Sequence, residues 1–167
     1  DYLKFNPEEL YYEVEVPYEI KNITVTAKLE VEYSNVSGKG TYPLNVGENL
    51  IKVTVTSAEG NTRDYQIMVR RLANTEARLS SLSVSGSDLT PVFDKDTYEY
   101  SLETTETSLS FTSIVPIDRE ATYEVLGNDL TALGLHEVIV RVTAANGTTT
   151  KDYKLNVTKQ PSSNNNL

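Results

Sequence analysis

Few side chains in this sequence could carry out catalysis. Nucleophilic catalysis needs a serine, threonine or cysteine beside a base that a third group orients, and the single histidine of the chain is His136. It lies in the segment Gly134-Leu-His, a predicted turn before a strand, where a structural or solvent-facing role is the ordinary one. No glycine-rich loop opens a helix, so no phosphate cradle is predicted. We therefore expect no catalytic residue, no cofactor-binding residue and no enzyme activity.

Carboxylates are the next candidates, because two of them at the right separation can catalyse hydrolysis. Four glutamates alternate with apolar residues, which is typical of the solvent-facing side of a strand: Glu13, Glu15, Glu30 and Glu32. A calcium site would need six to eight oxygen ligands. The loop acids that could supply some of them are Asp88, Asp94, Asp96, Asp118 and Glu120. Residues 70–78, which lie between the two halves of the chain, are basic, whereas a segment that binds calcium would be acidic. We therefore predict no metal site.

Tyrosine is the third residue type to consider, here as a candidate for ligand binding. The chain has eleven tyrosines, three phenylalanines and no tryptophan. Its flat apolar face and polar edge suit stacking on a sugar. Most tyrosines occupy the predicted buried phase of strands or recur at fixed positions, as Tyr12 with Tyr100 and Tyr65 with Tyr153 do. A tyrosine near the corner of a sandwich often ties a loop to the backbone, so we expect a core or corner role for these. The less regularly placed ones are the candidates for a glycan-binding surface: Tyr2, Tyr11, Tyr18 and Tyr42.

Strands must position all of these residues, because alternation with period two runs through the chain. In the first half we predict strands at 11–16, 23–27, 29–33, 51–55 and 65–69, with turns at 37–40, 45–49 and 59–61. In the second half we predict strands at 79–85, 98–103, 109–113, 122–126, 138–143 and 153–158. Apolar residues nowhere follow the spacing of a helix over three turns, so we expect an all-β protein.

The two halves repeat one pattern. Phe5 and Phe93 are 88 positions apart, as are Tyr65 and Tyr153, and Gly60 precedes its counterpart at position 147 by 87. A near-constant offset with matching residue types indicates two copies of one fold. On the same offset, His136 takes the place of Asn49, which favours a structural role for it. We therefore predict two domains, 1–72 and 73–160, followed by a disordered polar tail, 161–167.

One element breaks the symmetry between the copies. Residues 79–92 precede Phe93 and include a predicted strand, whereas only four residues precede Phe5. The first domain is therefore expected to lack its N-terminal strand. Such an open edge exposes unpaired backbone groups. It is either a fragment boundary or a cleft that another segment completes.

Composition limits the partners. The 167 residues carry a net charge of −9, which argues against nucleic acid and anionic membranes as partners. The chain has no cysteine, so a disulfide framework is excluded. No apolar run approaches the roughly 20 residues of a membrane span, and no signal peptide is present, so we expect the sequence to begin after any targeting segment.

The chain resembles the cadherin-like β-sandwich repeat that occurs in tandem in bacterial surface and secreted proteins. The residues that carry the resemblance in the second copy are Leu79-x-x-Leu82-x-Val84, Phe93-Asp94, Tyr100, Gly134, 138–144, Asn146-Gly147 and Tyr153. In the first copy they are Phe5-Asn-Pro, Tyr12, Gly47 with Asn49, 51–56, Gly60, Tyr65 and Arg70. The resemblance implies two tandem immunoglobulin-like, seven-stranded β-sandwiches, usually a spacer or adhesion module.

From these observations we expect a non-catalytic module of an extracellular or cell-surface bacterial protein, connected to neighbouring domains of the same polypeptide. A short, glycine-poor junction favours a stiff spacer. Two alternatives remain open: a module that binds a surface glycan or protein ligand, and accessory domains of a larger polysaccharide-degrading enzyme. No spacing singles out a lysine and an asparagine for an isopeptide crosslink.

Overall fold

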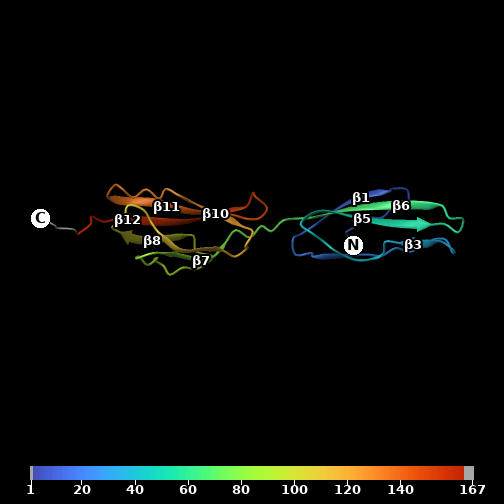
Figure 1. The fold of residues 1–167 in the computed structure, drawn as a ribbon, viewed down its shortest axis with the longest axis horizontal. Helices are drawn as coiled ribbons and strands as arrows, with labels where there is room; N and C mark the ends of the chain where they lie inside the picture. The colour runs from blue at the N-terminus through green and yellow to red at the C-terminus, as the bar shows by residue number, and fades with distance from the viewer. Residues whose placement is uncertain (1, 164–167) are drawn as a thin grey trace. The chain divides into compact units, whose positions relative to one another are not determined.

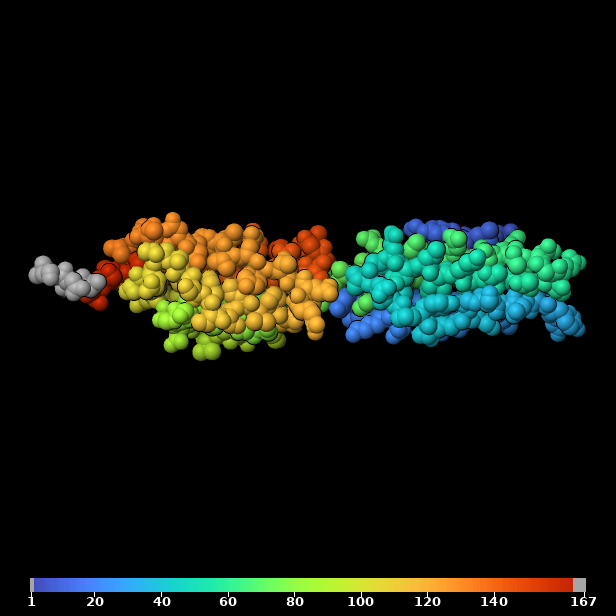
Figure 2. Space-filling model, viewed as in Figure 1, coloured from blue at the N-terminus to red at the C-terminus, as the bar shows by residue number. Residues whose placement is uncertain are grey.

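The computed structural model describes residues 2–163, and these form two compact units (Figure 1). The first unit spans Asp1–Ala73 and the second Asn74–Leu167. Each unit is built from one continuous stretch of chain, as the colours of Figure 2 show. The division falls next to the boundary predicted between residues 72 and 73. Residues 164–167 of the predicted tail lie outside the described residues.

Among its described residues the first unit contains six strands: β1 (Tyr11–Val16), β2 (Asn22–Val25), β3 (Asn35–Ser37), β4 (Gly40–Pro43), β5 (Gly47–Thr56) and β6 (Thr62–Arg71). They form a sheet in the order β1-β6-β5-β3 and a second sheet of β2 and β4. β1 runs parallel to β6, and the other pairs are antiparallel.

The second unit also has six strands among its described residues: β7 (Leu79–Val84), β8 (Glu99–Thr104), β9 (Phe111–Pro116), β10 (Thr122–Leu126), β11 (Gly134–Thr143) and β12 (Thr150–Lys159). The larger sheet has the order β10-β11-β12-β8, and β7 pairs with β9 in the smaller one. β8 is parallel to β12. Between residues 2 and 163 no helix forms, so none is present there that could cross a membrane.

Alternating side chains explain why these segments become half-buried strands. In β1 the side chains of Tyr12, Val14 and Val16 are at most 7% exposed, and the residues between them face solvent. In β12 Tyr153 and Val157 are fully buried. Successive residues of a strand point to opposite faces of the sheet. A slip of one residue would therefore turn the core side chains outward, so the pattern fixes the register.

The two hydrophobic cores differ in size. The first consists of eight buried residues: Tyr12, Val14, Val16, Leu44, Ile51, Val53, Ile67 and Val69. The second consists of sixteen: Ala77, Leu79, Leu82, Val84, Tyr100, Leu102, Leu109, Ala121, Leu130, Val138, Val140, Val142, Ala144, Tyr153, Leu155 and Val157. Strand β7, which has no counterpart among the described residues of the first unit, supplies three members of the larger core.

Each unit shows six of the seven strands that the resemblance implies, and the missing strand differs. The first unit has the β2–β4 pair but no strand before β1 among residues 2–10. The second has β7 but no counterpart of β4. There the side chain of Asn128 donates to the carbonyl of Leu109 at 2.9 Å and accepts from its N–H at 2.7 Å. One amide side chain thus satisfies both backbone groups of Leu109, as a neighbouring strand would.

Most predicted strands of both copies are confirmed, but the one predicted at 29–33 is wrong. Residues 26–34 belong to no strand, and Tyr33 has a positive φ of 68°. The alternation there is real, but a strand also needs a partner, and none lies beside this segment in the described residues. The short strands β3 and β4, on either side of the predicted turn, were not predicted because three or four residues carry too little periodicity.

The backbone at Gly127 lies close to the backbone of β11, so a substitution there tests the packing of the second unit's larger sheet. The φ of Gly127 is +71°, and a Cβ placed there would lie 2.6 Å from the backbone oxygen of Glu137. Gly147 has a similar φ of +73°, but a Cβ there would meet nothing within 4 Å. Both alanine variants carry the strain of a left-handed backbone. Gly127→Ala should lower the free energy of unfolding of the second unit by about 1–3 kcal/mol more than Gly147→Ala.

Urea denaturation followed by circular dichroism measures this difference. Equal losses in the two variants would show that the backbone around Glu137 moves aside without cost.

Candidate functional site

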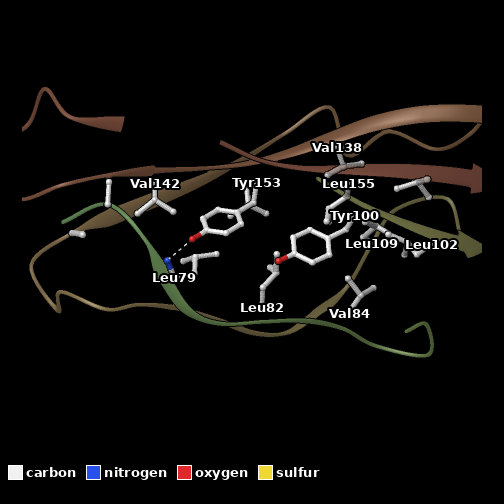
Figure 3. Close-up of a cluster of buried hydrophobic side chains, with 14 of the residues drawn as sticks. Leu79, Leu82, Val84, Tyr100, Leu102, Leu109, Val138, Val142, Tyr153 and Leu155 are labelled. Atoms are coloured by element: carbon white, nitrogen blue, oxygen red, sulfur yellow. Dashed lines mark hydrogen bonds between the residues drawn. The ribbon is translucent and has the colours of Figure 1, made fainter. Parts of the chain in front are cut away.

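Two buried tyrosines of the second unit bind backbone from other parts of the chain through their hydroxyls. Tyr153 of β12 donates from its hydroxyl to the carbonyl of Lys95 at 2.8 Å and accepts from the N–H of Leu79 at 2.9 Å (Figure 3). The hydroxyl of Tyr100, on β8, lies 2.7 Å from the carbonyl of Asp94 and accepts from the N–H of the same residue. We call this pair, with its counterpart in the first unit, the tyrosine clasp.

The clasp ties three separate parts of the chain together. The loop at 93–98 is held by both hydroxyls, and the start of β7 is held by Tyr153 alone. Phe93 packs against both rings, with centroid separations of 6.0 Å to Tyr100 and 6.1 Å to Tyr153. The aromatic faces supply apolar contact, and the hydroxyls satisfy backbone groups that burial would otherwise leave unpaired.

The first unit repeats the clasp with Tyr12 and Tyr65. The hydroxyl of Tyr12 donates to the carbonyl of Asn6 and accepts from its N–H, and the hydroxyl of Tyr65 donates to the carbonyl of Pro7 at 3.0 Å. Phe5 packs on both rings, as Phe93 does in the second unit. The corner role that the sequence assigned to these tyrosines is therefore what the structure shows. Tyr65 differs because, within residues 2–163, no backbone N–H donates to its hydroxyl as that of Leu79 donates to Tyr153.

Burial makes the phenols of Tyr100 and Tyr153 weaker acids. Desolvation raises the pKa of Tyr153 from 10.0 to about 12, because the charged phenolate is disfavoured away from water. The pKa of Tyr100 is raised for the same reason. At neutral pH both hydroxyls therefore stay protonated. They act as hydrogen-bonding groups and not as nucleophiles or bases.

The loop acids considered for calcium are spread over several turns. Asp94 accepts from the N–H of Asp96 at 2.8 Å, and Asp118 accepts from the N–H of Glu120 at 3.1 Å, so each pair closes a turn. The side chain of Asp88 makes no hydrogen bond or ion pair with the residues that the structure describes. Within residues 2–163, no three His, Cys, Asp or Glu side chains are placed to share a metal ion.

One of these acids instead belongs to a charged network at the start of the second unit. Arg78 donates to Glu76 at 2.6 Å and to Asp96 at 2.9 Å. Hydrogen bonds from the guanidinium lower the pKa of both carboxyl groups. The arrangement fixes the segment before β7 against the loop that the clasp holds. The four glutamates that alternate with apolar residues, Glu13, Glu15, Glu30 and Glu32, all face solvent, although only the first two lie on a strand.

His136 and Asn49 play the same part in the two units. The ring nitrogen Nε2 of His136 lies 2.7 Å from the carbonyl of Ala132, and the side-chain nitrogen of Asn49 donates to the carbonyl of Asn45 at 2.8 Å. In each case the side chain holds a carbonyl four residues earlier. The histidine thus closes the turn before β11, and this geometry uses it as a donor to the backbone.

The four tyrosines considered for glycan binding do not form one surface. Tyr42 donates to the carbonyl of Gly38 at 2.9 Å and packs against the core from β4. The ring of Tyr18 is covered by the guanidinium of Arg71, whose Cζ lies 4.7 Å from the ring centroid. Tyr2 and Tyr11 are about half exposed, and Tyr11 lies on β1, in a different sheet from Tyr42.

Sequence reasoning missed a buried cation at the end of each unit. Arg71, the last residue of β6, is 8% exposed and donates to the carbonyls of Tyr18 and Leu44. Lys159, the last residue of β12, is also 8% exposed and donates from Nζ to the carbonyl of Thr105. Arg71 and Lys159 are 88 positions apart, so the repeat offset pairs them and could have drawn attention to both. Their burial was missed because a lysine or arginine at the end of a strand is usually exposed.

The clasp hydroxyl of Tyr153 should contribute strongly to stability. Tyr153→Phe leaves the N–H of Leu79, whose side chain is fully buried, without its acceptor. We expect the free energy of unfolding of the second unit to fall by about 1–3 kcal/mol. Tyr123→Phe is the matched control, because Tyr123 is 48% exposed and its hydroxyl has no recorded partner in the described residues. The control should change the free energy of unfolding by less than about 0.5 kcal/mol in urea denaturation.

The same residue predicts an alkaline transition. Below pH 10 the Tyr153 phenol is protonated in both folded and unfolded chains, so it adds no pH dependence. Between pH 10 and pH 12 only the unfolded chain loses this proton, because the folded pKa is about 12. Stability should therefore fall across this window. Urea denaturation at several pH values should show a shallower fall in Tyr153→Phe, and identical slopes would contradict the buried phenol.

Comparison with known proteins agrees with this geometry. Residues 1–72 match the family model described as a cadherin-like beta sandwich domain. Comparison with curated proteins found no match. Among solved structures, the chain is similar to Drosophila N-cadherin EC1-3, with 8% identity and a TM-score of 0.49 over 90% of this chain and 65% of that chain.

Two further solved structures are similar to the chain. The protocadherin GammaB4 extracellular domain shows 10% identity and a TM-score of 0.35 over 91% of this chain and 31% of that chain. The fibronectin(III)-like modules of Clostridium thermocellum CbhA show 12% identity and a TM-score of 0.28, with 97% and 96% covered. The chain thus spans less than two thirds of either cadherin chain. The match to the model of the cadherin-like beta sandwich family therefore covers the first unit, residues 1–72.

Proposed function

We propose that the chain is a non-catalytic spacer in a bacterial cell-surface or secreted protein, where it connects and presents neighbouring domains of the same polypeptide. The fold is that of a structural or adhesion-type module. The more specific role rests on how each unit would respond to a force between its two ends.

The observation that carries this proposal is the parallel pairing of an early strand with the last strand of each unit. β1 pairs with β6 over six residues, from Tyr11 with Gln66 to Val16 with Arg71. β8 pairs in the same way with β12. In a parallel pair, the beginning of the early strand and the end of the last strand lie at opposite ends of the ladder. A force on the ends of the first unit therefore pulls the two strands past each other. In the second unit the force does so once β7, which precedes β8, has separated from β9.

This geometry resists force well because the ladder is loaded in shear. All hydrogen bonds between the two strands must lengthen together, whereas a hairpin pulled at its open end loses them one at a time. The clasp adds to this resistance, since Tyr65 and Tyr153 fasten the last strand to the loop that precedes the early strand. A spacer that transmits force between other domains must resist unfolding under that force. A flexible linker has no fold to lose and needs no such resistance.

Single-molecule force spectroscopy tests the shear geometry. Pulling through the chain ends should give two unfolding events, one for each unit, at forces above that of a peeling geometry in the same protein. The peeling control carries Val46→Cys and Leu72→Cys, which lie outside the open end of the β5–β6 hairpin and are both partly exposed. The chain has no native cysteine, so attachment is specific. Equal unfolding forces in the two geometries would contradict a force-resisting role.

The adhesion alternative predicts a different observation. A spacer should show no saturable binding on arrays of glycans and extracellular matrix proteins. Saturable binding that is lost with Tyr2→Ala or Tyr11→Ala would favour a binding module instead, because these are the exposed members of the tyrosine set.

A further inference from the structure

The turn between β11 and β12 contains the one asparagine of the chain that a glycine follows, in the pair Asn146-Gly147. An asparagine before glycine deamidates most readily, because glycine has no side chain to hinder attack of its amide nitrogen on the preceding carboxamide. Asn146 is half-buried and Gly147 is exposed, so water reaches the turn. The pair is therefore a candidate modification site that needs no enzyme.

The reaction involves atoms of these two residues and one water molecule. The backbone nitrogen of Gly147 loses its proton and attacks Cγ of Asn146. The bond from Cγ to Nδ2 breaks, and Nδ2 takes up a proton and leaves as ammonia. Water then opens the resulting succinimide at either carbonyl, which gives aspartate or isoaspartate. In sum, asparagine and water become the acid and ammonia.

The folded turn opposes this reaction at both nitrogen atoms. The N–H of Gly147 donates to the carbonyl of Ala144 at 2.9 Å, so the proton that must leave is held in a hydrogen bond. Nδ2 of Asn146, the leaving group, donates to Oγ1 of Thr149 at 2.8 Å.

The carboxamide oxygen of Asn146 is held as well. Oδ1 accepts from the N–H of Thr148 at 3.0 Å and from the N–H of Thr149 at 2.9 Å. Such bonds from an asparagine to the backbone that follows it are a usual way to close a turn. Attack makes Cγ tetrahedral and draws it towards the Gly147 nitrogen, which moves Oδ1 and Nδ2 away from these partners. The three hydrogen bonds of the carboxamide therefore oppose the reaction.

We propose that Asn146 is a deamidation site that reacts only when the end of the β11–β12 hairpin opens. Thr143 and Thr150 are the last pair of the two strands before the turn. Opening beyond this pair is local, and it needs less free energy than unfolding of the core strands. The opened turn is equivalent to a free peptide, in which nothing holds the Gly147 proton or the carboxamide.

The reaction makes such an opening permanent. Isoaspartate carries the main chain through its side-chain carbon, so the turn becomes one atom longer and the bond from Gly147 to Ala144 is lost. The N–H of Asn146 also donates to the carbonyl of Asn74 at 3.1 Å, and Asn74 begins the second unit. A turn that contains isoaspartate therefore loosens the first segment of the second unit as well.

Mass spectrometry of the whole chain, aged in warm and mildly alkaline buffer, tests the proposal. Peptides that contain residue 146 change in mass as an NH group is replaced by oxygen, and chromatography separates aspartate from isoaspartate. The reference is a synthetic peptide with the sequence of residues 142–151, VTAANGTTTK. Because each hydrogen bond shifts an equilibrium several-fold, the folded chain should react about tenfold or more slowly than the peptide. In urea that unfolds the second unit, the chain should react as fast as the peptide in the same urea.

Two matched variants locate the protection. Thr149→Val removes the oxygen that accepts from Nδ2 of Asn146 and should speed deamidation of the folded chain several-fold. Thr148→Val is the control, because Thr148 is exposed and its hydroxyl makes no hydrogen bond with the residues that the structure describes. The control should leave the rate unchanged. Circular dichroism checks that both variants are folded, and the comparison in urea needs neither of them.

Two outcomes would overturn the proposal. Equal rates in the folded chain and in the peptide would mean that the turn gives no protection. A folded chain that reacts faster than the peptide would mean that the two N–H groups on Oδ1 activate the carboxamide, as the donors of an oxyanion hole do.

Discussion

Both units depend on a tyrosine hydroxyl that binds backbone from a different part of the chain. Tyr153 joins the last strand of its unit to the loop before β8 and to the start of β7, and Tyr65 joins β6 to the loop that contains Pro7. Without these bonds, the loop backbone would be buried against aromatic rings with its polar groups unpaired, which is costly. The parallel pairing of early and last strands is built on this junction, because the loop sets where β1 and β8 begin.

Much of the fold could be predicted from the sequence. The alternation in β1 predicted the limits of that strand, and the offset between Phe5 and Phe93 predicted two copies of one pattern, with which the two compact units are consistent. The corner role of Tyr12, Tyr65, Tyr100 and Tyr153 followed from their fixed positions in that pattern. Strand limits depend on local alternation, and the tyrosine positions recur at a fixed offset. Both can therefore be recognised in a single sequence.

Features that depend on a distant partner were not predictable in the same way. The alternation at 29–33 is as regular as that of β1, but a strand needs a neighbour, and no described part of the chain pairs with residues 26–34. Asn128 replaces a strand with one side chain, and nothing in its local sequence distinguishes it from an ordinary turn asparagine. The buried positions of Arg71 and Lys159 likewise depend on carbonyls of residues far away in sequence.

The buried ends of the two units also differ in chemical reactivity. Lys159 has a primary amine that is shielded while the second unit is folded, whereas Arg71 presents a guanidinium to the same kind of carbonyl pocket. Reagents that acylate amines modify lysine and leave arginine intact. The rate at which Lys159 becomes labelled therefore measures how often the second unit opens. Opening of the first unit does not contribute to that signal.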